Sequence, residues 1–414
     1  MAIAELRDRT GGGHAVDVQS RLIPPVERAA GLIVRALEYA AAERSPLTPK
    51  IAAEAALVVH MLQATTSTSI TASTSTSTST STTAAPALRG IAEQLAAAVI
   101  ATGPTKHLAL RIALDPGHAL DHAAAPILLG TLGDDERAAL QEALSRNVFA
   151  ESLPHRVLER CWLAGLAGLA GLAGLAGLAV DANAEHAAYA LSAAAHPADV
   201  LAGTRLDAYA LTHTLMYGTA MGRRGGQFHQ PTTQIAAEAE ALLGWTVSAA
   251  DHDLTAELLL TWPLLQLPCS DGARWAAHHL LAVEHEHGYL PSRADRPGLS
   301  PRDHALGNYH AATVLCLLLA FALRQQEPPQ PWLPSAVDRA LRAQLASIGL
   351  GEVLSGMPCP ASLRLAAALR SAVSRADGTR VRELLTIAVT LGLDDSPAVA
   401  QAADTLTALA ALSR

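Results

Sequence analysis

Aromatic residues are scarce in this sequence: 3 Phe, 6 Tyr and 5 Trp make up 3% of its 414 residues. An enzyme that guides carbocations needs aromatic faces around the reacting carbon atoms. Terpene cyclases also carry a DxDD or DDxxD motif, and the chain has no convincing copy of either. Both absences disfavour carbocation cyclisation as the activity of this protein.

Clustered positive charge is absent as well. The chain has 30 Lys and Arg against 38 Asp and Glu, which gives a net charge of −8, and the basic loop GRRGG at 222–226 holds only two arginines. A nucleic-acid footprint needs a face with many more cations. We therefore expect no nucleic-acid partner and no binding to an acidic membrane.

Cysteine is rare and dispersed. Cys161, Cys269, Cys316 and Cys359 form no CxxC pair and lack the context of a zinc-dependent lanthipeptide cyclase. Such usage is typical of the reducing cytosol, and the first residues lack the apolar core of a signal peptide. No Walker loop, dinucleotide-binding glycine pattern or GxSxG elbow occurs. We expect a cytoplasmic protein with no bound metal or cofactor.

Alanine and leucine dominate instead. Half of the residues are hydrophobic, and Ala and Leu are strong helix formers. Apolar residues recur at helical spacing, and short joints with Gly, Pro, Asp or Ser separate the segments. No stretch reads as a convincing strand. The expected helices span 23–43, 49–63, 87–101, 134–149, 153–166, 184–195, 205–221, 232–245, 251–266, 271–286, 303–325, 334–348, 360–375, 379–392 and 396–413.

This succession of helices predicts an all-α fold built from antiparallel helix pairs. We expect the pairs to close into an α/α toroid; the alternative is an open helical-repeat solenoid. Residues 23–414 would form this single domain, preceded by a flexible N-terminus at 1–22.

Two low-complexity tracts interrupt the predicted domain. The Ser/Thr tract at 65–86 has no apolar face and predicts a disordered loop. The Leu-Ala-Gly repeat at 163–179 is long and uncharged enough to suggest a membrane span. However, leucine at every third position spirals around a helix, and repeated glycine disfavours helix formation. We expect a loop or the tail of a helix there, and no membrane partner.

One stretch resembles a known toroid repeat. WAAHHLLAVEHEHGYLPS at 275–292 resembles the helix-and-turn element of the α/α toroids of terpenoid cyclases and prenyltransferases, and 36–49 is a fainter copy. Glu284 and His287 stand where that element has Gln and Asp. The resemblance implies a toroid and does not extend to the chemistry.

A second resemblance covers more of the chain. Blocks at 153–163, 212–222, 251–260 and 308–320 resemble an uncharacterised actinobacterial family of all-helical proteins that carries a TH…Y block and a YH block. Where that family leads us to expect TDFG, the chain reads TAMG, so it lacks that aspartate. The resemblance implies a helical fold and no particular reaction.

Titratable side chains occur on three of the apolar helices. Residues four apart share a helix face, and polar groups buried without partners cost free energy. We therefore expect these groups to converge on a shared polar pocket inside the toroid. They are His213 with Tyr217, Asp253 with Glu257, and Tyr309 with His310.

Three uses of this pocket are open. The groups could pair with one another and lock helix packing, serve as general acid and base near neutral pH, or hold a divalent metal. The metal is disfavoured because no HxH or HExxH spacing lies within one helix. We assign catalysis to His213, Tyr217, Asp253, Glu257 and His310, and substrate binding to Tyr309, Arg223 and Arg224.

The sequence thus predicts a soluble helical toroid that acts as a tailoring enzyme of bacterial secondary metabolism, using acid–base chemistry on a small molecule or peptide. The alternative is a non-catalytic binding or scaffold protein of the same pathway. An enzyme should bring the five catalytic candidates into one cavity, whereas a scaffold should bury them as isolated pairs.

Overall fold

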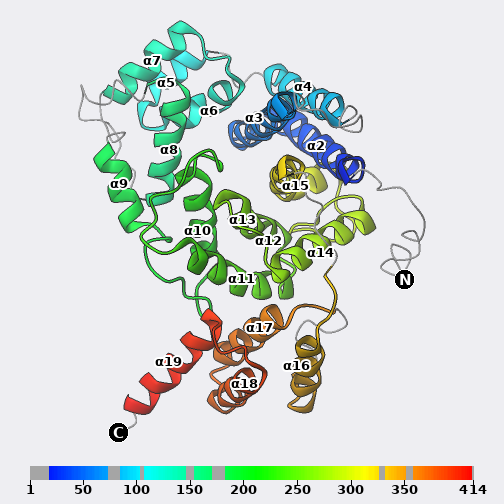
Figure 1. Cartoon of the computed structure of the whole chain (residues 1–414). Helices are drawn as coiled ribbons and strands as arrows, with labels where there is room; N and C mark the ends of the chain where they lie inside the picture. The colour runs from blue at the N-terminus through cyan, green and yellow to red at the C-terminus, as the bar shows by residue number, and fades with distance from the viewer. Residues whose placement is uncertain are drawn as a thin grey trace.

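The structure is a computed structural model that describes residues 18–72, 84–102, 107–145, 153–169, 182–325, 332–350 and 358–412. Regular structure in these segments consists of α-helices and one short 3-10 turn, with no strand. The all-α prediction is confirmed for this part of the chain. The helices lie in successive layers (Figure 1).

The first layer contains α2 (Val18–Ala42), α3 (Thr48–Ala72) and α4 (Ala84–Ala101), which contact one another. α2 begins within the stretch expected to be a flexible N-terminus. α3 extends into the Ser/Thr tract, where the hydroxyl of Thr65 donates to the carbonyl of Met61 at 2.9 Å. Such back-bonding satisfies the hydroxyl within the helix, so the tract is helical at its start. Residues 73–83 of the tract lie outside the described residues.

The next helices are α5 (Leu108–Leu114), α6 (Ala119–Leu129), α7 (Asp134–Ser145), α8 (Pro154–Leu166) and α9 (Ala182–Leu191). The sequence analysis does not predict α5 and α6, because they are short and the 3-10 turn Pro116–His118 interrupts the helical pattern. The start of the Leu-Ala-Gly repeat forms the end of α8, as expected. The chain then turns at Gly168, whose φ is 72°, and 170–181 lie outside the described residues.

The central helices are α10 (Arg205–Gly218), α11 (Thr232–Ser248), α12 (His252–Leu259), α13 (Thr261–Leu264), α14 (Asp271–His287) and α15 (Pro301–Gln325). A capping box between Thr204 and Asp207 fixes the start of α10. The single helix expected at 251–266 is divided at Leu260, because Pro263 has no N–H for the carbonyl four residues earlier and its ring clashes there.

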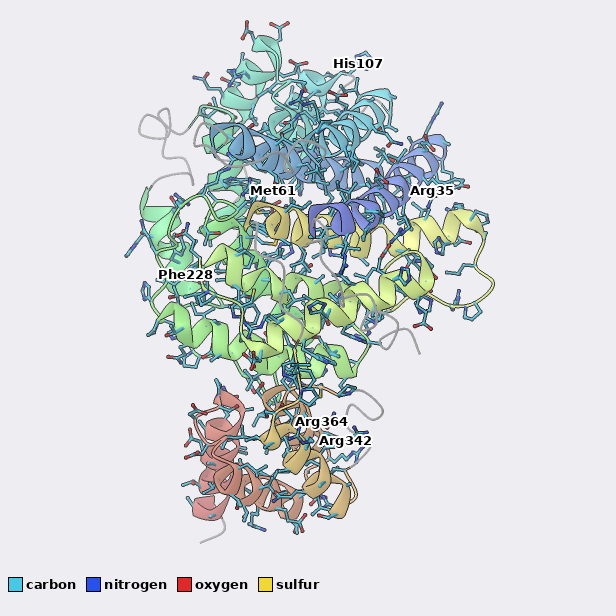
Figure 2. The ribbon with its side chains drawn as sticks, turned by 45° about the vertical axis from the view of Figure 1, so that its right-hand side comes forward. Arg35, Met61, His107, Phe228, Arg342 and Arg364 are labelled. Carbon is cyan, nitrogen blue, oxygen red and sulfur yellow. The ribbon has the colours of Figure 1, made fainter. Side chains whose placement is uncertain are left out.

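α15 lies between the first layer and α12. It contacts α2 and α3 on one side and α12 on the other, and Figure 2 shows it between the N-terminal helices and the group α10–α14. The most apolar 18-residue window within residues 301–324 has a mean hydropathy of 1.7, so by length and composition α15 could cross a membrane. However, 72% of its most apolar window is buried by the other helices, as in a core helix.

α3 and α15 run in the same direction. His310 contacts Glu54 near the start of both helices, and Thr65 donates to the carbonyl of Ala320 further along. The segment from α12 to α13 also runs this way: Glu257 of α12 contacts His310. Further along, Pro263 of α13 and Phe321 of α15 both lie against Gly222.

α8 and α10 share this direction. His155 packs against Tyr209, and one to two turns later Trp162 packs against Tyr217. α10 is parallel to α12, because it contacts that helix first through Arg205 and then through Thr212. Contacts between neighbouring helices lead from α3 through α6, α8, α10, α12 and α15 back to α3.

The last four helices form a separate group below the others in Figure 1: α16 (Ala336–Ser347), α17 (Ala361–Ser374), α18 (Gly378–Leu391) and α19 (Pro397–Leu412). Arg342 and Arg364 mark the upper part of this group in Figure 2. α17 packs closely on α11, where a Cβ added to Gly244 would lie 2.3 Å from the carbonyl oxygen of Leu363.

Candidate functional site

A buried carboxylate is the centre of the polar cluster. Glu257 on α12 is 3% exposed. It accepts a hydrogen bond from the hydroxyl of Thr212 at 2.6 Å and contacts His310 Nε2 at 3.1 Å. His213 Nε2 lies 3.9 Å from the same oxygen that His310 contacts. The sequence leads us to expect that His213, Glu257 and His310 converge, and the structure brings these three side chains together.

His310 bridges two carboxylates. Its Nε2 faces Glu257, and its Nδ1 lies 3.2 Å from Glu54 Oε2 on α3. Burial opposes the charged imidazole, but the hydrogen bonds and charges of Glu257 and Glu54 outweigh burial and raise the pKa of His310 to about 10. His310 is therefore a fixed cation at neutral pH.

Glu257 is correspondingly a fixed anion. Burial by itself would raise the pKa of Glu257, but the hydrogen bond from His310 and the charges of the His310 and His213 rings hold that pKa well below its usual range. A carboxylate of this kind does not exchange protons near neutral pH. Its chemical effect is to orient its neighbours and stabilise positive charge on them.

The network extends from the buried centre towards solvent. The side chain of His310 is 27% exposed and that of Glu54 is 17% exposed. Lys50 Nζ lies 3.7 Å from Glu54 and is 58% exposed. The sequence analysis missed Glu54, because a Lys and a Glu four residues apart are typical of a solvated helix surface.

His213 is enclosed by rings. Its imidazole lies over Tyr209 with a centroid distance of 3.8 Å and an interplanar angle of 30°. The rings of His155 and Tyr217 approach it edge-on at 5.9 and 5.6 Å. Within the described residues, its polar contact with Glu257 at 3.9 Å is longer than a hydrogen bond.

Tyr217 points its hydroxyl to a different acid. It donates a hydrogen bond to Glu159 on α8. Burial raises the pKa of the Tyr217 phenol well above its usual value and also raises the pKa of Glu159, although Arg156 and His213 oppose the latter shift. Arg156 pairs with Glu159 and, at 2.6 Å, with Asp121. Tyr217 therefore contacts the cluster through its ring and stays neutral.

Asp253 belongs to another group, although it shares a helix face with Glu257. Arg205 binds Asp253 at 2.6 Å and Asp251 at 2.9 Å. Burial and the neighbouring Asp251 raise the pKa of Asp253 to about 6. Asp253 therefore forms a group with Arg205 and Asp251, and it is not part of the hydrogen-bonded network around Glu257.

The three predicted substrate-binding residues are spread apart. Tyr309 is buried with its ring centroid 6.4 Å from that of His310, and its phenol forms no side-chain hydrogen bond within the described residues. Arg224 pairs with Glu185. Arg223 is exposed and contributes to the electrostatic field at His60, away from Glu257. Only Tyr309 lies beside the network.

The described residues hold no group of three or more His, Cys, Asp or Glu side chains arranged to bind a metal ion. The chemistry that these side chains offer is proton transfer and binding of polar groups. The imidazole of His213 offers one nitrogen that donates and one that accepts. The phenol hydroxyls of Tyr209 and Tyr309 form no side-chain hydrogen bond in the described part of the chain. They can therefore donate a hydrogen bond to a ligand.

Comparison with known proteins gives one match. A family model described as a domain of unknown function, DUF6895, matches residues 27–320. This span includes the whole network from Glu54 to His310 and ends before α16–α19. No curated protein and no solved structure matches the chain.

Proposed function

Because this chain belongs to the DUF6895 family, whose description gives no activity, we propose a function from the site alone: the protein is an enzyme that transfers protons on a small molecule or peptide, with His213 as its acid–base group. The observation that carries this proposal is the position of His213 beside a fixed carboxylate. Glu257 is held by Thr212 and His310, so it can orient the imidazole and stabilise its protonated form.

Among the titratable side chains of the cluster, His213 remains as the candidate for proton transfer. His310 has both ring nitrogens against carboxylates, and Tyr217 donates to Glu159. If Nε2 of His213 carries the proton and faces Glu257, Nδ1 is left as the basic nitrogen. A carboxylate behind an imidazole is the arrangement by which acid–base enzymes fix the tautomer.

The toroid is part of the proposal. Five parallel helices, α3, α8, α10, α12 and α15, and the circuit of contacts that closes through α6 support a ring of inner helices. Glu54, Glu159, Glu257 and His310 come from four of these helices. The proposed setting, the cytoplasm and secondary metabolism of a bacterium, rests on the sequence resemblance and the cysteine usage.

A binding or scaffold protein is the second candidate, and two observations favour it. Asp253 lies in a separate group with Arg205 and Asp251, so the five catalytic candidates do not form one cluster. His310 joins α3, α12 and α15 through two ion pairs, which is the expected arrangement for a cation that locks helix packing. In this reading His213 would only fill space between Tyr209 and Glu257.

Replacing His213 by asparagine separates the two candidates. We would incubate wild type, His213→Asn and the surface control His285→Asn with a small-molecule extract of the source cells, and follow substrate loss and product gain by mass spectrometry. An enzyme predicts conversion by wild type and the control, at least 100-fold slower conversion by His213→Asn, and similar melting curves for all three. A His213→Asn variant that is fully active, or a wild type that binds a compound and never converts it, would refute catalysis.

A further inference from the structure

A cationic group lies at the far end of α15 from His310. Arg324 is in the last turn of this helix, and its guanidinium lies over the ring of Phe321, 5.5 Å from the centroid. Its Nε is buried and has no hydrogen-bond partner. Helical side chains lean towards the N-terminus, so this guanidinium points back into the protein along α15.

An unusual turn brings a second arginine to this place. Ala220, Met221 and Gly222 all have positive φ, at 50°, 56° and 75°. Two consecutive non-glycine residues in this region cost conformational energy and occur where the surrounding structure requires them. A Cβ on Gly222 would lie 3.2 Å from the ring of Phe321, so the turn packs on the same ring as Arg324 and presents Arg223 beside it.

A histidine lies beside these two arginines. One ring nitrogen of His60 on α3 donates a hydrogen bond to the carbonyl of Leu128, and the other, Nε2, is buried without a hydrogen-bond partner. Burial, together with the charges of Arg223 and Arg324, lowers the pKa of His60 to about 4. The field of both guanidinium groups therefore reaches the unpartnered nitrogen.

No acid among the described residues balances these charges. In this part of the chain, neither the Arg223 nor the Arg324 side chain forms an ion pair or a hydrogen bond. The adjacent Arg224, in contrast, pairs with Glu185. Two neighbouring cations repel each other, and burial together with the charge of Arg223 lowers the pKa of Arg324. An anion between them would remove this repulsion and satisfy the free donors.

We propose that Arg223 and Arg324, with His60 beside them, form a binding site for an oxyanion, the phosphate or carboxylate group of a ligand. The fork of a guanidinium matches both groups and binds them with two parallel hydrogen bonds. The site is separate from the acid–base cluster: the rings of Trp162 and Tyr217 lie between His60 and His213. It does not depend on the proposed catalysis.

The test uses inorganic phosphate and sodium acetate as probes, titrated by calorimetry into the full chain in chloride buffer of matched ionic strength. Wild type should bind at least one of them with a dissociation constant in the millimolar range or below. Arg223→Gln and Arg324→Gln should each weaken binding at least tenfold. The control Arg35→Gln, an exposed residue of α2 seen in Figure 2, should bind as wild type does, and so should His213→Asn.

The outcomes separate the possibilities. Tighter binding of phosphate assigns the site to phosphorylated ligands, and tighter binding of acetate assigns it to carboxylates. No binding of either anion, or equal binding by wild type and Arg223→Gln, overturns the proposal; Arg223 is exposed, so its loss should not unfold the protein. Loss of binding in His213→Asn would place the anion at the other site and also overturn it.

Discussion

Replacing His310 by glutamine should destabilise the protein and remove part of its pH dependence. The side chain contacts Glu257 and Glu54 at 3.1 and 3.2 Å. Glutamine is neutral, so Glu257, at 3% exposure, would lose its nearest cation and keep Thr212 as its hydrogen-bond donor. Breaking a buried ion pair in this way costs about 3 kcal/mol or more. We expect a loss of that size in the free energy of unfolding near neutral pH.

The pH dependence gives the sharper result. The pKa of His310 is about 10 in the folded protein and about 6.5 in an unfolded chain. Because the folded value is raised, the stabilisation is complete below about pH 6.5 and disappears as the pH rises through about 10. In this window the folded state holds one more proton, so stability falls by about 1.4 kcal/mol per pH unit.

Glutamine cannot titrate and removes this slope. The difference in unfolding free energy between wild type and His310→Gln should therefore shrink by about 2 kcal/mol between about pH 7.5 and about pH 9. Urea unfolding at several pH values measures the difference, and other alkaline titrations cancel in it. His285→Gln, on the exposed end of α14, is the control and should change stability by less than about 0.5 kcal/mol. A wild-type advantage that stays constant over this range would refute the bridging cation.

Two matched pairs of variants test other parts of the structure. Asp251→Asn should cost about 2 kcal/mol at neutral pH, because this 1% exposed carboxylate accepts from Arg205. Asp253→Asn should cost less than about 1 kcal/mol, because its pKa is already raised to about 6; urea unfolding that reverses this order would contradict the assignment. Gly244→Ala should cost about 2 kcal/mol or more, because its Cβ would lie 2.3 Å from a backbone oxygen of α17. Gly90→Ala, with nothing within 4 Å, should gain about 0.5 kcal/mol or more, and equal melting shifts for both would refute the close approach of α11 and α17.

The sequence predicts the convergence of His213, Glu257 and His310 because each stands in an apolar helix. Polar groups in such places need partners, and few polar groups are available on these helices. Burial alone sets this requirement, so it holds whichever helices pack together. The contacts of these side chains follow from it, whereas the catalytic use of His213 stays a prediction. The match to a family of unknown function over most of the chain and the helical structure of the described residues are confirmed, whereas closure into a toroid is part of our proposal.

Side chains that depend on helix pairing could not be placed from the sequence. Asp253 and Glu257 share a face, yet Arg205 from the start of α10 binds the first of them. Arg223 and Arg224 are neighbours, yet only the second meets an acid. Local spacing determines which face a residue occupies, and the partner across that face depends on which helix packs there.

The charges of the two sites constrain what a single ligand would look like. Around Glu257, two carboxylates are matched by His310 and Lys50, so this cluster needs no charge from a ligand. The group at Arg324 lacks an anion. His310 and Arg324 are fourteen residues apart on α15, which is roughly 21 Å along the helix axis. The guanidinium of Arg324 lies over Phe321, and the distance from His310 to that position is roughly 16 Å along the axis. An extended peptide covers that distance with about five residues. A ligand that filled both sites would therefore be a chain of this length with an anionic end, whereas a molecule the size of a single sugar would reach one site only.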